Sequence, residues 1–395
     1  MTPGLLIVGG GLAAQRCCET LRALGHDAPI TIVGAERVAP YDRPPLSKEL
    51  LDGPAEAPWL RPRAWHAEQG VALRLGAAAV RLRAGRRVIE LAGGERLRYD
   101  DLLIATGSEP VRLPALAGFS NVQALRTFDD AVRLRAALAA GAALTVVGGG
   151  LIGLEVASSA RRLGAAVTVV EAAPQPLSGL LGPDVGHHLA SLHREDGVAL
   201  RLGVPLASAR GGTAGIEEGA PSRGVASGGP LVEELVLADG SRIATDHVVE
   251  AVGVRPATGW LAGSGLDPRG VSAGEGGHTA LPHVFAAGDV TGSGHWDAAA
   301  RQGAGVARAL LGLTPAPPAP PSFWSDQLGL RLQCVGDPAG ARAQLDVDAE
   351  GRGFEAVYRR EGRVSAVLLA GRSAADLRAA RRRLSPAPEL ERSAA

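Results

Sequence analysis

The chain has 395 residues, and its 41 acidic and 41 basic residues give a formal net charge of zero. This length predicts two or three domains, and the balanced charge argues against a protein that binds nucleic acid or a membrane surface throughout. No apolar run approaches the ~18 residues that cross a bilayer. The first predicted strand starts by Leu5, which leaves no room for a signal peptide, so we expect a cytoplasmic location.

The first predicted elements have the order of a dinucleotide-binding fold. An apolar strand, Leu5–Val8, runs into Gly9–Ala14 and a helix that ends near Leu24. A second strand, Ile30–Val33, leads to Glu36. A strand, a G-x-G-x-x-A loop, a helix, a strand and an acid in this order predict a nucleotide site.

Each residue of this pattern has a physical role in such a site. Gly9 permits the tight turn, and Gly11 lets a pyrophosphate approach the backbone at the helix N-terminus. Ala14 keeps the helix close to the sheet, and Glu36 could accept ribose hydroxyls.

The next segment, Tyr41–Lys48, contains the only lysine of the chain. Lysine is a compact charge on a narrow stem, whereas arginine is a broad planar fork. One interpretation is that the ammonium points at a cofactor edge where a guanidinium would not fit. The other is that a composition bias towards arginine has spared one surface lysine.

The cysteines and histidines do not form the patterns of a disulfide, dithiol or metal site. Cys17, Cys18 and Cys334 form no C-x-x-C pair, so no disulfide framework or dithiol relay is predicted, and the first two are expected in a helix core. His187, His188 and His193 are spaced so that they do not align on one helix face. We predict no metal site.

Extended segments are expected near Val71–Leu75 and Val88–Leu91, followed by a buried strand within Asp101–Gly107. The small residues Thr106 and Gly107 would bring the backbone close to a ligand, or they form an ordinary turn after a strand.

A second dinucleotide pattern then follows. The strand Leu144–Val147 leads into Gly148–Gly153, a full G-x-G-x-x-G, and a helix to about Leu163. The next strand, Val167–Val170, ends at Glu171. An acid at this distance bonds the adenosine 2′-hydroxyl and repels a 2′-phosphate, which favours NADH over NADPH.

Arg161 and Arg162 could bind a 2′-phosphate, so NADPH stays an alternative cofactor, although the simpler interpretation places both on an outer helix face.

Two dinucleotide folds in one chain indicate one bound flavin and one diffusing nicotinamide cofactor.

The rest of the sequence predicts fewer distinct motifs. We expect a mobile loop at 210–230, a strand over Asp246–Val252 that ends at Gly253, and a strand and tight turn within Thr279–Asp289. A helix is predicted from Trp296 to Leu311 and a proline-rich linker over 314–321. Short strands and a closing helix near Ala374–Leu384 make a small last domain.

Together these motifs resemble the FAD-dependent pyridine-nucleotide reductases that pass electrons to ferredoxins for oxygenases, a fold family that includes the apoptosis-inducing-factor flavoproteins. The resemblance covers nearly the whole chain. It rests on Val8–Ala14, Tyr41–Lys48, Ala105–Gly107, Val147–Glu155, Thr279–Asp289 and Phe323–Gln327.

The resemblance implies an α/β fold with two Rossmann-like domains, the FAD domain being split around the NAD domain, and a small α+β C-terminal domain. The expected parts are residues 1–110 and 245–314 for FAD, 111–244 for NAD(H) and 315–395 for the C-terminal interface domain.

The resemblance also implies residue roles. Arg43 and Lys48 would contact the flavin, Asp289 would hold the ribityl chain and Trp296 would lie beside the ring. Glu155 would lie near the nicotinamide and pair with Lys48, so these two are the expected catalytic residues. The remaining expected cofactor-binding residues are Gly9, Gly11, Leu12, Ala13, Ala14, Glu36, Val80, Ala105, Thr106, Gly107, Arg126, Gly148, Gly150, Leu151, Ile152, Gly153, Glu171 and Gly253.

The predicted function is transfer of hydride from NADH to FAD, and of single electrons to a small acidic ferredoxin that feeds an oxygenase or cytochrome P450. The alternatives are a rubredoxin reductase, an NADH oxidase and a redox-sensing interaction flavoprotein. No nucleic-acid or membrane partner is expected, and the chain would be a monomer or homodimer. Arg378, Arg381, Arg382 and Arg383 could attract the ferredoxin, or form a solvated helix face.

Three departures from the family pattern limit what the resemblance implies. One is Glu109, which follows Ser108 where relatives often carry arginine. Ala35 stands where relatives usually have an acid, with Glu36 one place later, and the connection over 290–296 is short. The ribose contact and the identity of the acceptor are therefore open.

Overall fold

The computed structural model describes residues 4–53, 56–212, 229–314, 317 and 319–384. Two compact units are formed, and each gathers separate segments of the chain. The first holds Met1–Val111, Leu125–Val132 and Gly253–Pro318, and the second holds Arg112–Ala124, Arg133–Val252 and Ala319–Ala395. Within the described ranges, no helix combines the length and apolar character needed to span a membrane.

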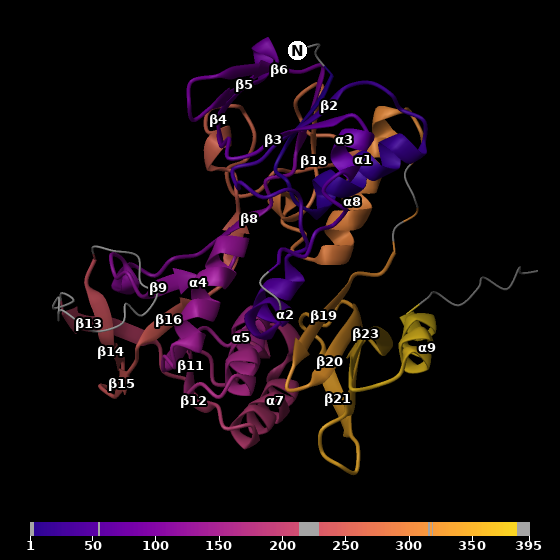
Figure 1. Cartoon of the computed structure of the whole chain (residues 1–395). Helices are drawn as coiled ribbons and strands as arrows, with labels where there is room; N and C mark the ends of the chain where they lie inside the picture. Colours follow the sequence, from indigo (N-terminus) through magenta and orange to yellow (C-terminus); the bar gives the residue numbers. More distant parts are fainter. Residues whose placement is uncertain (1–3, 54–55, 213–228, 315–316, 318, 385–395) are drawn as a thin grey trace, which may run out of the picture. The chain divides into compact units, whose positions relative to one another are not determined.

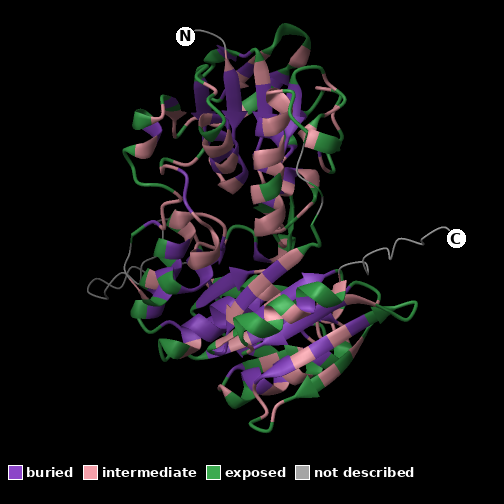
Figure 2. Cartoon of the chain, turned by 90° about the vertical axis from the view of Figure 1, so that its right-hand side faces the viewer, coloured by how far each residue is buried: buried purple, intermediate pink, exposed green. Residues whose placement is uncertain are grey.

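The first unit is built on a parallel five-stranded sheet (Figure 1). Its strands, in sheet order, are β18 (Val284–Ala286), β7 (Asp101–Ile104), β1 (Leu5–Val8), β2 (Ile30–Val33) and β3 (Val71–Arg74). All residues of β1 and β2 are buried, which agrees with the all-apolar sequence of β1 and with a β2 in which Thr31 is the one polar residue (Figure 2).

Helices α1 (Leu12–Ala23) and α8 (Trp296–Leu310) lie side by side in this unit (Figure 1). Ala14, Cys17, Cys18 and Leu21 of α1 are each 0% exposed and share a core with Val306 of α8. The predicted placement of the two cysteines in a helix core is confirmed.

Smaller elements complete the first unit. They are α2 (Glu49–Asp52), α3 (Trp65–Glu68), an antiparallel sheet of β4 (Ala79–Arg83), β5 (Val88–Leu91) and β6 (Arg96–Arg98), and a two-stranded pair of β8 (Ser108–Pro110) with β17 (Val254–Pro256).

The second unit repeats the design with another parallel five-stranded sheet. Its strands, in sheet order, are β12 (Ala199–Leu202), β11 (Val167–Glu171), β10 (Leu144–Val147), β16 (His247–Glu250) and β9 (Val122–Ala124). Its helices are α5 (Leu151–Arg162), α6 (Ser178–Leu181) and α7 (Pro183–Glu195), and α4 (Phe128–Ala139) starts in the first unit and ends in the second. A side sheet contains β13 (Leu206–Gly212), β14 (Leu231–Leu237) and β15 (Arg242–Ala244).

The C-terminal segment adds an antiparallel sheet and one helix to the second unit. Its strands, in sheet order, are β19 (Ser322–Gln327), β20 (Leu330–Gly336), β23 (Arg363–Ala370), β22 (Phe354–Arg360) and β21 (Arg342–Val347), and α9 (Ala374–Leu384) follows. Phe354 and Tyr358 of this sheet share a core with Leu189 of α7, and the Tyr358 hydroxyl donates to Leu181 O at 2.8 Å. The sheet is therefore anchored on the nucleotide-fold helices.

The predicted strands and helices mostly occur, with shorter bounds. The strand expected within Thr279–Asp289 is limited to Val284–Ala286, since Thr279 closes a turn by donating its hydroxyl to Val284 O at 2.8 Å. The loop expected at 210–230 begins later, because β13 extends to Gly212. The rest of that loop, 213–228, and residues 315, 316 and 318 of the expected linker lie outside the described residues.

Candidate functional site

The first glycine loop connects β1 to α1. Gly9 has φ +112°, and a Cβ there would lie 2.1 Å from Ala105 O, so both conformation and space require glycine. Gly11 is the N-cap of α1, and a Cβ on it would meet nothing within 4 Å. The loop thus leaves open space in front of a helix N-terminus, where backbone N–H groups attract a phosphate.

Helix α8 supports this loop from behind. A Cβ on Gly303 would lie 2.2 Å from Ala13 O, so the two helix backbones touch at this point. Gly288 N donates to the Gln302 amide oxygen of α8 at 2.7 Å. The helix that presents the loop is therefore fixed in position.

Glu36, the acid after β2, lies in a network of hydrogen bonds. Its carboxylate accepts the Tyr41 hydroxyl at 2.6 Å and pairs with the Arg43 guanidinium at 2.7 Å. Tyr41 in turn accepts from Phe128 N, at the start of α4, at 3.0 Å. A carboxylate has about four acceptor positions, so sites remain for ribose hydroxyls.

Arg126, Asp289 and Ser108 form a second, linked group. Arg126 pairs with Asp289 at 3.2 Å, and the Ser108 hydroxyl donates to the same carboxylate at 2.9 Å. Arg126 also accepts a hydrogen bond from Arg43 through its backbone oxygen. Burial, and then the nearby Arg43, lower the pKa of Arg126.

This second group also shapes the turn after β7. A Cβ on Gly107 would lie 3.2 Å from the Arg126 guanidinium, and the Thr106 hydroxyl donates to Ala257 O at 2.9 Å. The structure therefore brings together Glu36, Arg43, Gly107, Arg126 and Asp289, which were predicted separately. Tyr41 and Ser108 are residues that the sequence did not assign to the site.

Trp296, the first residue of α8, donates its indole N–H to Asp42 at 2.7 Å. Burial raises the pKa of Asp42, and the indole hydrogen bond partly offsets it. Asp42 was not predicted as a site residue, although it lies inside the Tyr41–Lys48 motif.

Lys48 is 6% exposed, which excludes the interpretation of a surface lysine. Its ammonium donates to Pro44 O at 3.0 Å and to the Ser47 hydroxyl at 3.4 Å. Pro44–Ser47 form a short 3-10 helix that ends at Lys48. The narrow stem is thus folded back against its own proline-stiffened turn.

The second glycine loop, in the second unit, has the same geometry as the first. Gly148 also has φ +112°, and a Cβ on it would lie 2.3 Å from Ala251 O. Gly150 caps α5 and faces open space, while a Cβ on Gly153 would lie 2.1 Å from Gly148 O. Glu171 accepts from Gly149 N at 2.6 Å and from Ala173 N at 2.8 Å, so the acid is bound directly to the loop.

Glu155 lies on α5, five residues after its N-cap, and is 5% exposed. Its carboxylate accepts the Ser325 hydroxyl of β19 at 2.6 Å. Lys48 belongs to the first unit and Glu155 to the second, so their predicted pairing stays a prediction.

The other predicted residues occupy varied environments. Ala13 and Ala105 are buried beside the first loop, Leu12 is half-buried, and Gly253 has φ +108° after β16. Leu151 is half-buried, and Ile152 and Val80 are 40% and 50% exposed. Arg161 is half-buried and donates to Ala165 O at 2.7 Å, whereas Arg162 is exposed, which matches an outer helix face.

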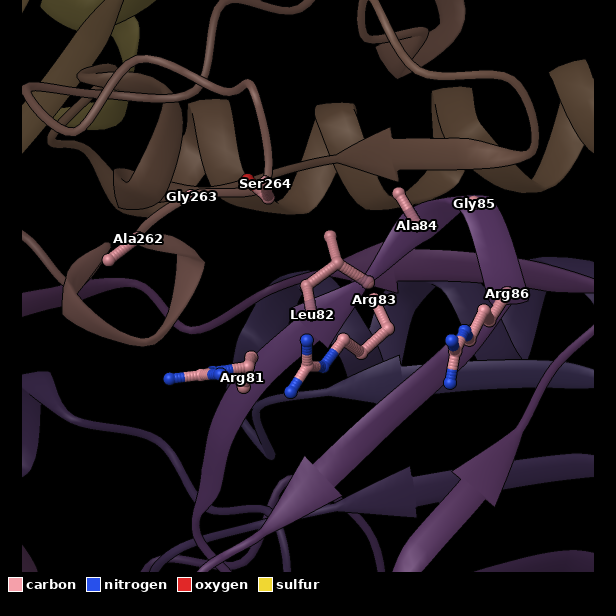
Figure 3. A pocket seen from close by; sticks show the side chains of 9 residues that line it. All are labelled: Arg81, Leu82, Arg83, Ala84, Gly85, Arg86, Ala262, Gly263 and Ser264. Atoms are coloured by element: carbon pink, nitrogen blue, oxygen red, sulfur yellow. The ribbon is translucent and has the colours of Figure 1, made fainter.

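A pocket of about 450 Å³ lies elsewhere in the first unit, between β4 and the loop Ala262–Ser264 (Figure 3). Leu82 points towards that loop, whereas the guanidinium group of Arg83 points away from it (Figure 3). Arg81 and Arg83 pair with Glu90, at 4.0 and 3.4 Å. None of the predicted cofactor-binding residues lines this pocket.

Comparison with known protein families identifies the class. The family described as "Pyridine nucleotide-disulphide oxidoreductase" matches residues 3–303. The chain belongs to this family. A second family, "Reductase C-terminal", matches residues 322–395.

Relatives within the pyridine nucleotide-disulphide oxidoreductase family cover nearly the whole chain. The chain is 37% identical over 362 residues to the ferredoxin–NAD(+) reductase component of the p-cumate 2,3-dioxygenase system of Pseudomonas putida, covering 89% of this chain and 85% of the relative.

Several solved structures are similar over at least 95% of this chain, among them two reductases. The covalent putidaredoxin reductase–putidaredoxin complex has a TM-score of 0.87 at 30% identity and covers 97% of this chain and 93% of that chain. The ferredoxin reductase for the CYP199A2 system from Rhodopseudomonas palustris has a TM-score of 0.84 at 28% identity and covers 95% and 93%. The predicted resemblance and the two Rossmann-like folds with a C-terminal sheet domain are confirmed.

The family name includes a disulphide, but this chain offers no dithiol. Its three cysteines are free and buried. Burial raises the pKa of Cys18 and of Cys334 to about 12. A thiolate is the reactive form of cysteine. Because burial keeps these thiols protonated, they do not supply the thiolate that a thiol relay needs.

Proposed function

We propose that this chain is an FAD-dependent NADH:ferredoxin oxidoreductase that serves an oxygenase or cytochrome P450. Bound FAD would take hydride from NADH and release electrons singly to a ferredoxin-type iron–sulfur protein. The observation that carries the proposal is the pair of glycine loops, each open at a helix N-terminus, in a chain whose relatives are ferredoxin–NAD(+) reductase components.

The first unit supplies residues that fit FAD. Open space at Gly11 suits the pyrophosphate, and Glu36 retains acceptor positions for a ribose. We assign the other end of the cofactor to Arg43, Asp289 and Trp296, whose side chains are held by the hydrogen bonds described above.

The second unit supplies residues that fit NADH. Gly150 leaves space for a pyrophosphate at the N-terminus of α5. Glu171 is held by two backbone N–H groups, and its carboxylate would accept adenosine 2′-hydroxyl and repel the 2′-phosphate of NADPH. NADH is therefore the preferred reductant.

We assign Lys48 and Glu155 to the reacting end of both cofactors. A fixed ammonium stabilises negative charge that arrives with a hydride, and a carboxylate partner would avoid a net buried charge.

The four-part domain division, the monomeric or homodimeric state and the cytoplasmic location also remain predictions.

The test is steady-state reduction of a [2Fe–2S] ferredoxin by the purified FAD-loaded protein with NADH. We expect rapid ferredoxin reduction that requires both the protein and NADH. Rapid oxygen consumption without ferredoxin would indicate an oxidase, and preference for rubredoxin would indicate the corresponding reductase. Slow turnover with every acceptor would favour a redox-sensing interaction protein.

A further inference from the structure

Four buried polar side chains form a continuous chain of hydrogen bonds that ends at Glu155. His193 Nε2 contacts Gln327 Oε1 at 2.8 Å, and Gln327 Nε2 donates to the Ser325 hydroxyl at 3.1 Å. Ser325 donates to Glu155 Oε1 at 2.6 Å. The four residues are 0%, 1%, 0% and 5% exposed, in that order.

The chemistry of the groups fixes the direction of every bond. A carboxylate only accepts, so the single Ser325 proton points at Glu155 and the serine oxygen must accept from the Gln327 amide. The amide oxygen therefore faces His193, whose Nε2 carries a proton. Each group determines the orientation of the next.

The far end of the chain agrees with this assignment. Burial lowers the pKa of His193, and its Nδ1 is buried without a hydrogen-bond partner among the described residues. A second ring proton there would leave an unpaired buried N–H⁺, which is costly. Neutral His193 therefore acts as a hydrogen-bond donor to Gln327, and the orientation of the other three groups needs no other contact from it.

Strand β19, which carries Ser325 and Gln327, is followed by a second contact with α5. Leu328 N donates to the Ser158 hydroxyl at 2.7 Å, one turn along α5 from Glu155. Leu328 has φ +59°, so the chain turns sharply after β19. The C-terminal segment thus holds α5 through two serine hydroxyls, and that of Ser325 donates to Glu155.

We propose that Ser325 and Gln327 are positioning residues that hold the Glu155 carboxylate in one orientation for the reduced nicotinamide cofactor. The inference rests on the proposed function, in which Glu155 lies at the reacting end. It assigns the C-terminal sheet a role in the hydride-accepting half of the reaction.

The test is anaerobic single-turnover reduction of the FAD-loaded protein at saturating NADH. Ser325→Ala removes a hydrogen bond to a charged group and should slow reduction about tenfold, with little change in the NADH concentration for half saturation. Ser325→Thr restores the hydroxyl and should recover the rate. Ser325→Cys keeps the volume with a weaker donor and should be intermediate, which provides a readout if the alanine variant does not fold.

Ser158→Ala is the matched control, because it removes the other serine hydroxyl between β19 and α5. It should lower the unfolding midpoint and keep the wild-type reduction rate. A reduction rate in Ser325→Ala within about twofold of wild type would overturn the inference.

A double-mutant cycle separates positioning from general packing. Once Glu155→Ala has slowed reduction, adding Ser325→Ala should have no further effect. The inference is overturned if Ser325→Ala slows reduction equally with and without Glu155. It is also overturned if Glu155→Ala itself has no effect. Neither result contradicts the proposed reductase function. A wild-type protein that NADH does not reduce overturns the proposed function and the inference with it.

Discussion

At the scale of single residues, Lys48 is the most sensitive position. Its buried ammonium contacts Pro44 O and the Ser47 hydroxyl, and the broader, planar guanidinium of Lys48→Arg cannot occupy the same space. We expect at least tenfold slower flavin reduction by NADH in stopped flow. Arg98→Lys, at an exposed position of β6, is the control and should retain the wild-type rate. Full activity of Lys48→Arg would contradict the assignment.

Glu171 is the residue expected to select the nicotinamide cofactor. Glu171→Ala removes the acceptor for the 2′-hydroxyl and the repulsion of a 2′-phosphate. The ratio of kcat/KM for NADH to that for NADPH should fall about tenfold or more. Glu36→Gln is a matched control in the first loop system, where we expect weaker FAD retention and an unchanged cofactor ratio. An unchanged ratio in Glu171→Ala would show that selection lies elsewhere.

At the scale of elements, the contact between α1 and α8 carries the first nucleotide loop. Gly303→Ala would force a Cβ to within 2.2 Å of Ala13 O, and the two backbones must separate at a cost of about 1–3 kcal/mol. We expect a lower free energy of unfolding and a lower FAD content per chain. Gly305→Ala, on the same helix with nothing within 4 Å of its Cβ, should instead stabilise α8 by up to about 1 kcal/mol. Equal stability changes in both variants would contradict the tight contact.

Strand β16 contains a pH-sensitive group. Burial, and then Arg133, lower the pKa of His247 to about 4, and its Nε2 has no hydrogen-bond partner among the described residues. Because the folded pKa lies below the unfolded value of about 6.5, the unfolded state binds the proton first. Stability from this group is complete above about pH 6.5 and is lost as the pH falls towards 4, by about 3 kcal/mol in total.

His247→Phe should remove this part of the pH dependence, as measured by denaturant unfolding between about pH 7 and 4.5. The same substitution at exposed His187 is the control and should leave the slope unchanged. A slope in His247→Phe equal to that of the wild type would contradict the assignment.

At the scale of the whole molecule, local patterns predicted both nucleotide folds but few contacts between distant segments. Gly9, Gly148, Glu36 and Glu171 are set by neighbours in the sequence, so motifs were sufficient to place them. Pairing of Ser108 in β8 with Pro256 in β17 joins segments far apart in the chain, and no periodicity marks it.

Arg126 illustrates the same limit. Its segment, Leu125–Val132, joins the first unit while the residues on both sides join the second, and only the family resemblance identified it. The chain of hydrogen bonds from His193 to Glu155 combines residues from α5, α7 and β19. It could therefore be found only once the fold was known. Conversely, the Tyr41 hydroxyl donates to Glu36 at 2.6 Å, and both residues lie in segments that the sequence did single out.

The distribution of charge predicts how the whole protein meets its acceptor. The formal net charge is zero, but Arg378, Arg381 and Arg382 are exposed on α9, and an acidic ferredoxin would be attracted by them. Ferredoxin reduction should slow as ionic strength rises from ~0.01 to ~1 M, over which the Debye length falls from about 30 to about 3 Å. Flavin reduction by NADH should change little over this range. A ferredoxin rate insensitive to salt, or unchanged in Arg378→Glu/Arg382→Glu, would contradict an electrostatic role for α9.

Electron transfer from NADH through bound flavin to ferredoxin is tested most directly by double-mixing anaerobic stopped flow, with NADH or NADPH first and an oxidised [2Fe–2S] ferredoxin second. We expect NADH to bleach the flavin absorbance faster than NADPH does, and two equivalents of ferredoxin then to be reduced per flavin as the absorbance returns. A protein that binds no flavin, that is reduced only by NADPH, or whose reduced flavin does not transfer electrons to ferredoxin would contradict this expectation.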